Sequence, residues 1–300
     1  MQKRVLVTGV SGFAGRYLSP VMAAAGYEVV GTAHVQDGVP VDGCTEVHKV
    51  DLRDPAETQA LVQAVAPTHV VHLAAISFVG HEDVREIYET NIVGSRNLLS
   101  ALAGLAAKPQ RVLLTSSANV YGNSTKGILT EADELNPAND YAVSKAGMEM
   151  MSRQFAESLD IVIARPFNYT GIGQADNFLI PKIVGHFRDR AAVVELGNTD
   201  VSRDFSDVRT VVDYFRRLLE SPLTVGHVYN VCSGVPSSLQ QIVTMCEAIT
   251  GRTIEVRINP AFVRANEIKT LVGSPARLHA DIGSAGDIPL EETLRWMLEA

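Results

Sequence analysis

The chain has 300 residues, of which 46% are hydrophobic, so it is long enough to bury a large core. Its formal net charge is −8, which argues against a general nucleic-acid or membrane-surface binder, because phosphate-rich partners attract basic proteins. The three cysteines, Cys44, Cys232 and Cys246, have no CxxC spacing and no histidine cluster beside them. We therefore expect free thiols, with no disulfide framework and no metal site.

The sequence also indicates where in the cell the protein is expected. The start of the chain passes from Met1 to Arg4 directly into an apolar run at Val5, which leaves no room for a signal peptide. No apolar run approaches the roughly 20 residues of a membrane span. We therefore expect a cytoplasmic protein.

Short apolar runs alternate with amphipathic stretches through the first half of the chain. Because these runs are continuously apolar, without alternation of polar residues, they predict buried parallel strands covered by helices on both faces. This pattern is typical of a doubly wound α/β fold. The runs lie at residues 4–8, 28–32, 46–50, 68–73, 111–116 and 161–164.

The residue composition changes after about Pro166, where turn-forming residues become more frequent. A helix at 207–219 and a strand at 228–231 follow, and a further helix that Ser237 or Ser238 can cap ends at Gly251. Residues 252–277 carry five basic and two acidic residues, against the sign of the whole chain. We expect a smaller, mostly C-terminal substrate-binding lobe that is interleaved with the main domain.

A glycine-rich turn follows the first predicted strand. Gly9 permits the tight turn, Gly12 lets the backbone approach a pyrophosphate, and Gly15 lets the helix pack closely on the strand. An ordinary strand-to-helix turn is the alternative, but the position directly after the first strand favours a dinucleotide site. We thus expect an NAD(P)-binding Rossmann domain over residues 1–168, with about 205–234 included, and the lobe over 169–300.

The end of the second strand bears on cofactor choice. An NAD-preferring site presents a carboxylate there, but this chain has Gly31-Thr32-Ala33-His34. No carboxylate repels a 2′-phosphate and no arginine clamps it, so both NADP(H) and NAD(H) stay open.

Tyr141 and Lys145 lie four residues apart, which places a phenol and an ammonium on one face of a helix. The nearby charge is expected to lower the pKa of the phenol, making it a proton donor for hydride chemistry. Ser117, at the end of the strand at 111–116, is the expected hydroxyl for the reacting oxygen, in preference to Ser116. A solvated helical pair is the alternative to this interpretation.

The GxxGxxG loop, the SSxxVYG strand end and YxxxK together resemble the extended short-chain dehydrogenase/reductase family. More narrowly, the chain is similar to enzymes of GDP-mannose conversion. The narrower likeness rests on the segments at 164–168, 177–178, 196–198, 201–205, 207–208, 229–234 and 264–267.

The resemblance implies residue roles. Ser117, Tyr141 and Lys145 are the expected catalytic residues. The expected cofactor-binding residues are Gly9, Ser11, Gly12, Phe13, Ala14, Gly15, His34, Asp51, Leu52, Leu73, Ala74, Ala75, Asn91, Thr115, Tyr141, Lys145 and Pro166. The expected substrate-binding residues are Ser77, Asn119, Asn168, Asn177, Lys182, Gly197, Asn198, Arg203, Arg264 and Glu267.

The reaction type follows from what stands after the catalytic serine. A 4,6-dehydratase of the family places an acid/base carboxylate there, but this chain has Ala118 and Asn119, which do not titrate. The resemblance therefore implies NAD(P)H-dependent reduction of GDP-4-keto-6-deoxy-D-mannose to GDP-D-rhamnose. A dehydratase, another nucleotide-sugar epimerase and a catalytically silent nucleotide sensor are the alternatives. The expected partners are a GDP-linked sugar and a second copy of the chain, paired through residues 83–107 and 140–159.

Overall fold

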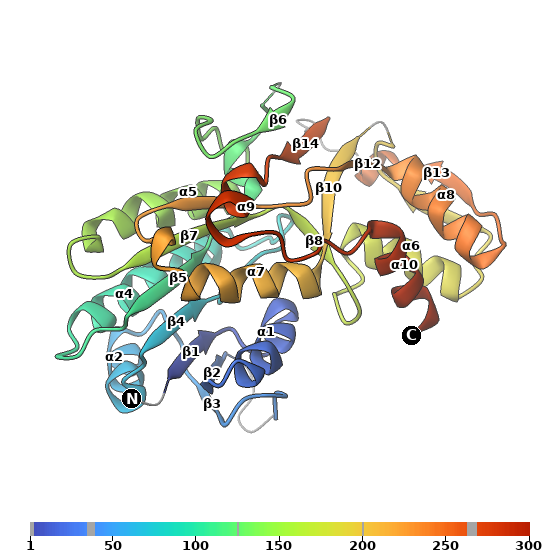
Figure 1. Ribbon diagram of the computed structural model, residues 1–300. Helices are drawn as coiled ribbons and strands as arrows, with labels where there is room; N and C mark the ends of the chain where they lie inside the picture. Colours follow the sequence, from blue (N-terminus) through green and yellow to red (C-terminus); the bar gives the residue numbers. More distant parts are fainter. Residues whose placement is uncertain (1–2, 35–39, 125, 200, 263–268) are drawn as a thin grey trace.

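The computed structural model describes residues 3–34, 40–124, 126–199, 201–262 and 269–300. Its main sheet has seven strands, paired in parallel in the order β11-β7-β5-β4-β1-β2-β3 (Figure 1). The strands are β1 (Arg4–Thr8), β2 (Glu28–Ala33), β3 (Glu46–Lys49), β4 (His69–His72), β5 (Arg111–Thr115), β7 (Ile161–Pro166) and β11 (Val228–Val231).

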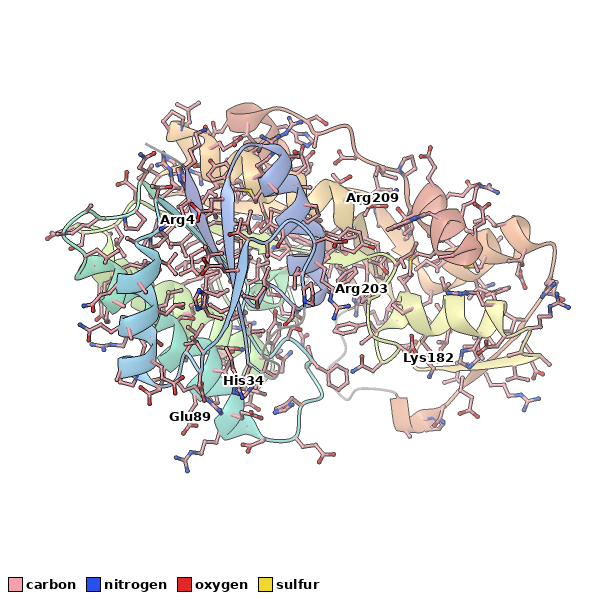
Figure 2. All side chains as sticks on the ribbon, turned by 90° about the horizontal axis from the view of Figure 1, so that it is seen from below. Arg4, His34, Glu89, Lys182, Arg203 and Arg209 are labelled. Carbon is pink, nitrogen blue, oxygen red and sulfur yellow. The ribbon has the colours of Figure 1, made fainter. Side chains whose placement is uncertain are left out.

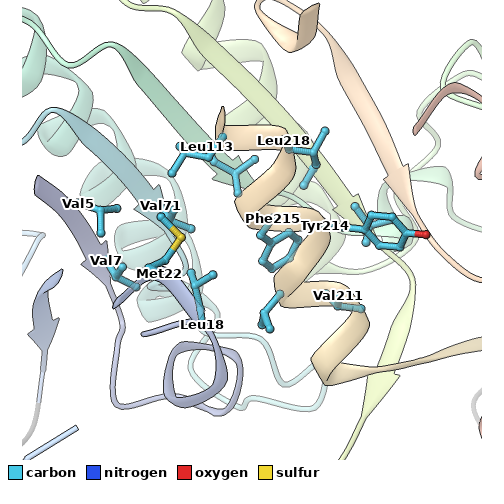
Figure 3. Close-up of a cluster of buried hydrophobic side chains, with 14 of the residues drawn as sticks. Val5, Val7, Leu18, Met22, Val71, Leu113, Val211, Tyr214, Phe215 and Leu218 are labelled. Carbon is cyan, nitrogen blue, oxygen red and sulfur yellow. The ribbon is translucent and has the colours of Figure 1, made fainter. Parts of the chain in front are cut away.

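Helices cover both faces of this sheet. On one face α1 (Phe13–Ala24) and α7 (Val208–Glu220) pack on the strands, with Leu18, Met22 and Phe215 in the shared core (Figure 3). The other face is covered by α2 (Pro55–Val65), α4 (Ser95–Ala103) and α5 (Asp140–Ser152). The predicted fold class, a doubly wound Rossmann sheet, is confirmed.

The strand order reverses between β1 and β4, which lie side by side although two strands separate them in sequence. Helices on either side of such a point leave toward opposite faces, so a crevice opens at the carboxyl ends of the strands. Gly9, after β1, and Leu73, after β4, both line that crevice. The fold therefore fixes where a ligand is held before any side chain is considered.

The smaller part has its own core and two small sheets. One sheet runs β12-β10-β14-β6 with β8 paired to β10, and the other pairs β9 with β13. Helices α6 and α8 pack together, and α10 contacts both. The elements are β6 (Ile128–Leu129), β8 (Asn168–Thr170), α6 (Leu179–Arg188), β9 (Val193–Leu196), β10 (Ser202–Asp207), β12 (Pro236–Ser238), α8 (Leu239–Thr250), β13 (Glu255–Ile258), β14 (Thr270–Gly273) and α10 (Leu290–Glu299).

The ends of α8 follow the predicted capping chemistry. Ser238 accepts from the amide of Gln241, whose side chain accepts from the Ser238 amide in return. Gly251 ends the helix in the left-handed region at φ 67°. Of the two candidate caps, Ser238 is therefore the one used.

The chain crosses between the two parts several times. After β10 it returns to the main sheet through α7 and β11, and after β14 the helix α9 (Ala276–Ile282) packs beside β11. Leu278 of α9 joins the core under α1 and α7, and the Tyr229 hydroxyl donates to Asp281 at 2.6 Å. The smaller part is therefore interleaved with the sheet.

A continuous helical segment covers residues 84–103. It consists of α3 (Val84–Tyr88), a single π-helical segment (Glu89–Gly94) and α4. Within the described ranges, no helix has the length and apolar character needed to cross a bilayer.

Candidate active site

A cleft of about 1970 Å³ runs along the carboxyl ends of the main strands and continues against the smaller part. Figure 2 shows His34 at the end of the cleft beside the sheet, and Arg203 and Lys182 on the side of the smaller part. The cleft thus has room for an elongated ligand that touches both parts of the protein.

The glycine loop forms a cradle at the start of α1. Gly9 has φ +70°, and a Cβ there would lie 2.8 Å from the Ala74 backbone. A Cβ on Gly15 would lie 2.4 Å from the Val10 carbonyl oxygen, so neither position accepts a larger residue without movement. No side chain caps α1 and its first turn holds no acidic residue, which leaves backbone amides for an anion. The loop fits the pyrophosphate of a dinucleotide.

The far end of the cleft contains an arginine that the sequence reasoning did not name. Arg53, just after β3, donates to both carboxylate oxygens of Asp51, at 2.9 Å and 2.7 Å, and lies 3.3 Å from His34. The guanidinium holds the pKa of Asp51 down, to about 2. His34 follows β2 and Arg53 follows β3, so the two side chains meet only because these strands are paired.

The Ser–Tyr–Lys group converges in the middle of the cleft. Asn139 caps α5, which places Tyr141 and Lys145 on the cleft side of the helix, 8% and 3% exposed. Lys145 Nζ donates to the Thr115 carbonyl at 2.8 Å, and the Tyr141 hydroxyl is hydrogen-bonded to Ser117. These three side chains therefore meet at one point, from the end of β5 and the first turns of α5.

The ionisation of this group differs from the expectation. Burial raises the pKa of Tyr141, opposed by the hydrogen bond to Ser117, and the Lys145 charge is not among the causes of the shift. Burial lowers the pKa of Lys145 to about 8, while the charge of Glu149 opposes that shift. In this structure the pKa of Tyr141 is therefore raised, because burial is the largest influence on it.

The two neighbouring serines point to different surroundings. Ser116 donates to the buried carboxylate of Glu149, behind the cleft. Ser117 begins the 3-10 turn Ala118–Tyr121, and its hydroxyl accepts from Asn119 Nδ2 at 3.0 Å. The geometry favours Ser117 over Ser116 for contact with a bound oxygen.

One expected cofactor residue lies elsewhere. Asn91 is buried behind the cleft, where it donates to the Ile76 carbonyl at 3.0 Å and to Ser144 Oγ at 2.9 Å and accepts from the Ile76 amide. Asn91 is not part of the cleft lining, and its amide holds the segment after β4 against α5, so it supports the cleft from behind.

The remaining expected cofactor residues all line the cleft. On the substrate side, Ser77, Asn119, Asn168, Asn177, Lys182, Gly197, Asn198 and Arg203 line it as well. Arg203 Nη1 donates to the carbonyls of Ser202 and Lys269, at 3.0 Å and 3.3 Å. Arg264 and Glu267 lie outside the described residues.

Asp204, beside Arg203, is structural. Its buried carboxylate accepts from the amides of Ser233 and Gly234 at 2.9 Å and 2.8 Å, tying β10 to the turn after β11. Burial raises its pKa, and these hydrogen bonds oppose the rise.

The sequence reasoning also missed an aromatic wall. Tyr169 of β8 lines the cleft and stacks on Phe13 of the glycine loop, with ring centroids 5.8 Å apart and planes 8° apart. Tyr17 continues the contact to Trp296 of α10, at 6.1 Å, and Arg209 lies 3.9 Å above the Trp296 ring. The position of Tyr169 immediately after Asn168 is the sequence signal that could have found it.

The parallel sheet, the glycine cradle and the Ser–Tyr–Lys group define an NAD(P)-dependent oxidoreductase of the extended short-chain dehydrogenase/reductase class. A family model described as GDP-mannose 4,6 dehydratase matches residues 6–297, and the chain belongs to this family.

Two curated relatives cover nearly the whole chain. GDP-6-deoxy-D-talose 4-dehydrogenase of Aggregatibacter actinomycetemcomitans is 33% identical, over 94% of this chain and 92% of the relative. GDP-6-deoxy-D-mannose reductase of Pseudomonas aeruginosa is 34% identical, over 99% and 97%. A solved structure of RMD from Pseudomonas aeruginosa complexed with NADPH is 32% identical with a TM-score of 0.85, over 100% of this chain and 97% of that one.

Proposed function

We propose that the protein reduces the 4-keto group of GDP-4-keto-6-deoxy-D-mannose with NAD(P)H, giving GDP-D-rhamnose. The observation that carries the proposal is the meeting of Ser117, Tyr141 and Lys145 in a cleft that also contains the glycine cradle. The similarity to a GDP-6-deoxy-D-mannose reductase supports the substrate.

The proposed roles of the residues follow from their positions. A reduced nicotinamide held in the cleft would supply the hydride for the carbonyl carbon. Tyr141 gives its hydroxyl proton to the carbonyl oxygen, and Ser117 donates a hydrogen bond to the same oxygen. Lys145, held by the Thr115 carbonyl, stabilises the phenolate that Tyr141 becomes.

Reduction is favoured over 4,6-dehydration by the residues after Ser117. Elimination requires a group that removes the C5 proton, and a family dehydratase carries a carboxylate at this turn. Here the turn presents buried Ala118 and then Asn119, whose amide donates to Ser117. Hydride and proton transfer need only the three residues already in place.

The opposite epimer at C4, GDP-6-deoxy-D-talose, is a second candidate product. The relative from Aggregatibacter actinomycetemcomitans, named for that sugar, is about as similar to this chain as the mannose reductase is, at 33% against 34%. The two products differ only in the face of C4 that receives the hydride.

One experiment tests both candidates. Purified protein is mixed with GDP-4-keto-6-deoxy-D-mannose and NADPH or NADH, loss of reduced-cofactor absorbance is followed, and the sugar is identified by NMR. We expect stoichiometric cofactor oxidation and one C4 epimer. Absence of cofactor oxidation, or conversion of GDP-mannose to its 4-keto-6-deoxy derivative, would contradict the proposal.

A further inference from the structure

A buried ionic cluster lies directly behind the cleft. Glu149 is one helical turn after Lys145 on α5, and its side chain is 2% exposed. Arg165 of β7, 5% exposed, donates Nε to Oε1 at 2.9 Å and Nη2 to Oε2 at 2.7 Å. Ser116 Oγ donates to the same Oε1 at 2.5 Å. The carboxylate thus ties α5 to the ends of β5 and β7.

The cluster extends further from Arg165. Its Nη1 donates to the Tyr121 hydroxyl at 2.8 Å, and that hydroxyl donates to Asn230 Oδ1 at 2.6 Å. Tyr121 ends the 3-10 turn that Ser117 begins. Both ends of the turn that carries Ser117 are therefore fixed to Glu149, one through Ser116 and one through Arg165.

Stability alone does not explain this cluster. A buried ion pair often contributes no more to folding than apolar side chains of similar volume, because desolvation offsets the attraction. What the pair does supply is fixed geometry, since a bidentate arginine and carboxylate hold two elements in one relative position. The elements held here are those that bring Ser117 to Tyr141 and Lys145.

We propose that Glu149 is a positioning residue: its carboxylate holds the Ser117 turn and the end of β7 against α5, one helical turn after Lys145. This inference rests on the proposed function only because the proposed reduction is used as the assay. Any other hydride transfer in this cleft would use the same Ser117, Tyr141 and Lys145.

The charge of Lys145 depends on the groups around it. On α5 these are Tyr141 and Glu149, and on β4 it is His72, whose pKa burial lowers to about 3, so that it stays neutral. Arg165 of β7 forms an ion pair with Glu149, and Tyr169 of β8 is close enough to Tyr141 to interact with it. Among the described groups, Glu149 is therefore the negative charge that acts on Lys145.

The first test replaces the charge while keeping the shape. Glu149→Gln removes the negative charge that raises the pKa of Lys145, so Lys145 loses its proton at lower pH. We expect the fall of kcat/KM at high pH, the basic limb of the pH profile, to begin at lower pH. We also expect kcat for reduction to fall roughly tenfold or more. The KM for the sugar and the dissociation constant of NADPH, measured by cofactor fluorescence, should stay within about twofold.

Two matched variants separate geometry from charge. Ser116→Ala removes one hydrogen bond and leaves the charge, so it should lower kcat without moving the basic limb. Glu157→Gln removes an exposed carboxylate beyond the end of α5 and should change none of these quantities.

A double variant covers the case in which Glu149→Gln does not fold. Glu149→Leu with Arg165→Met replaces the ion pair by apolar side chains, which commonly preserves folding. We expect it to bind NADPH and to show the lowered kcat of Glu149→Gln. Because both charges of the pair are removed, its pH profile should move less than that of Glu149→Gln. If either folded Glu149 variant keeps the wild-type kcat and pH profile, Glu149 is structural and the inference is wrong. A wild-type protein that does not oxidise NAD(P)H with the sugar contradicts the proposed function instead.

Discussion

Tyr141 is the side chain whose hydroxyl must give up a proton. Burial raises its pKa, so the free enzyme holds the phenol protonated at neutral pH, as a proton donor requires. The hydrogen bond between the Ser117 and Tyr141 hydroxyls opposes this rise. The chemistry is therefore concentrated in one hydrogen-bonded pair.

Replacing Tyr141 by Phe should lower kcat by roughly 10²- to 10⁴-fold, because the hydroxyl acts mainly in the transition state. The dissociation constant of NADPH should change little. Steady-state kinetics and cofactor fluorescence measure the two effects, and Tyr17→Phe serves as a control for loss of a phenol outside the cleft lining. A variant with wild-type kcat would remove Tyr141 from the mechanism.

The pH dependence of reduction follows from Lys145. Its pKa is lowered by burial to about 8, and reduction uses its cationic form, which is lost as pH rises through that value. We therefore expect kcat/KM to be highest below about pH 8 and to fall above it. Lys145→Arg, which stays charged, should move this limb to higher pH, and an unmoved limb would assign the titration to another group.

At the scale of elements, the close approach of α1 to the loop after β1 decides whether the cofactor cradle exists. Gly15→Ala places a Cβ 2.4 Å from a backbone oxygen, which cannot move away as a side chain can. We expect a loss of stability of about 1–3 kcal/mol and weaker NADPH binding. Gly104→Ala is the control, since its Cβ would meet only atoms 3.5 Å away. Thermal unfolding and cofactor titration distinguish the two.

The sequence predicted the strands of the main sheet closely because their signal is local. Continuous apolar runs at residues 4–8 and 111–116 correspond to β1 and β5 within a residue. By contrast, β10 reads Ser-Arg-Asp-Phe-Ser-Asp and pairs with β14, more than sixty residues later. Such pairings depend on tertiary contacts that no run of residues encodes.

The candidate site likewise contains residues with a local sequence signal and residues that only tertiary contacts bring together. The glycine loop, Tyr141 and Lys145 are recognisable because their spacing is set by one loop or one helix. Arg53 and Tyr169 come to the cleft from separate strand ends, so their neighbours are far away in sequence. Asn91 was placed in the right region, but the face toward which it points depends on the packing of α5.

At the scale of the whole molecule, we propose that the dinucleotide-binding domain comprises residues 1–168 with about 205–234, and the substrate lobe most of 169–300. Strand β11 belongs to the main sheet and α7 packs on it, which supports assigning residues 205–234 to the dinucleotide-binding domain. The packing of α9 beside β11 indicates that this part of the lobe supports the sheet as well.

We also propose that the protein is a homodimer through the helices at 83–107 and 140–159. Val84, Val93, Val143 and Met150 are apolar and between 39% and 56% exposed, and α5 packs against both α3 and the π-helical segment. Light scattering should give twice the 32.3 kDa of the chain. Val143→Glu with Met150→Glu should give monomers, whereas Val235→Glu, at another exposed apolar position, should not.

The aromatic wall that joins Phe13, Tyr17 and Tyr169 to Trp296 links segments that lie far apart in the sequence. During translation the glycine loop leaves the ribosome well before α10, so the loop lacks this neighbour until α10 has been synthesised. A frameshift or stop codon just before Leu290 would spare every residue of the Ser–Tyr–Lys group. It would still leave the loop without the Trp296 side of its support.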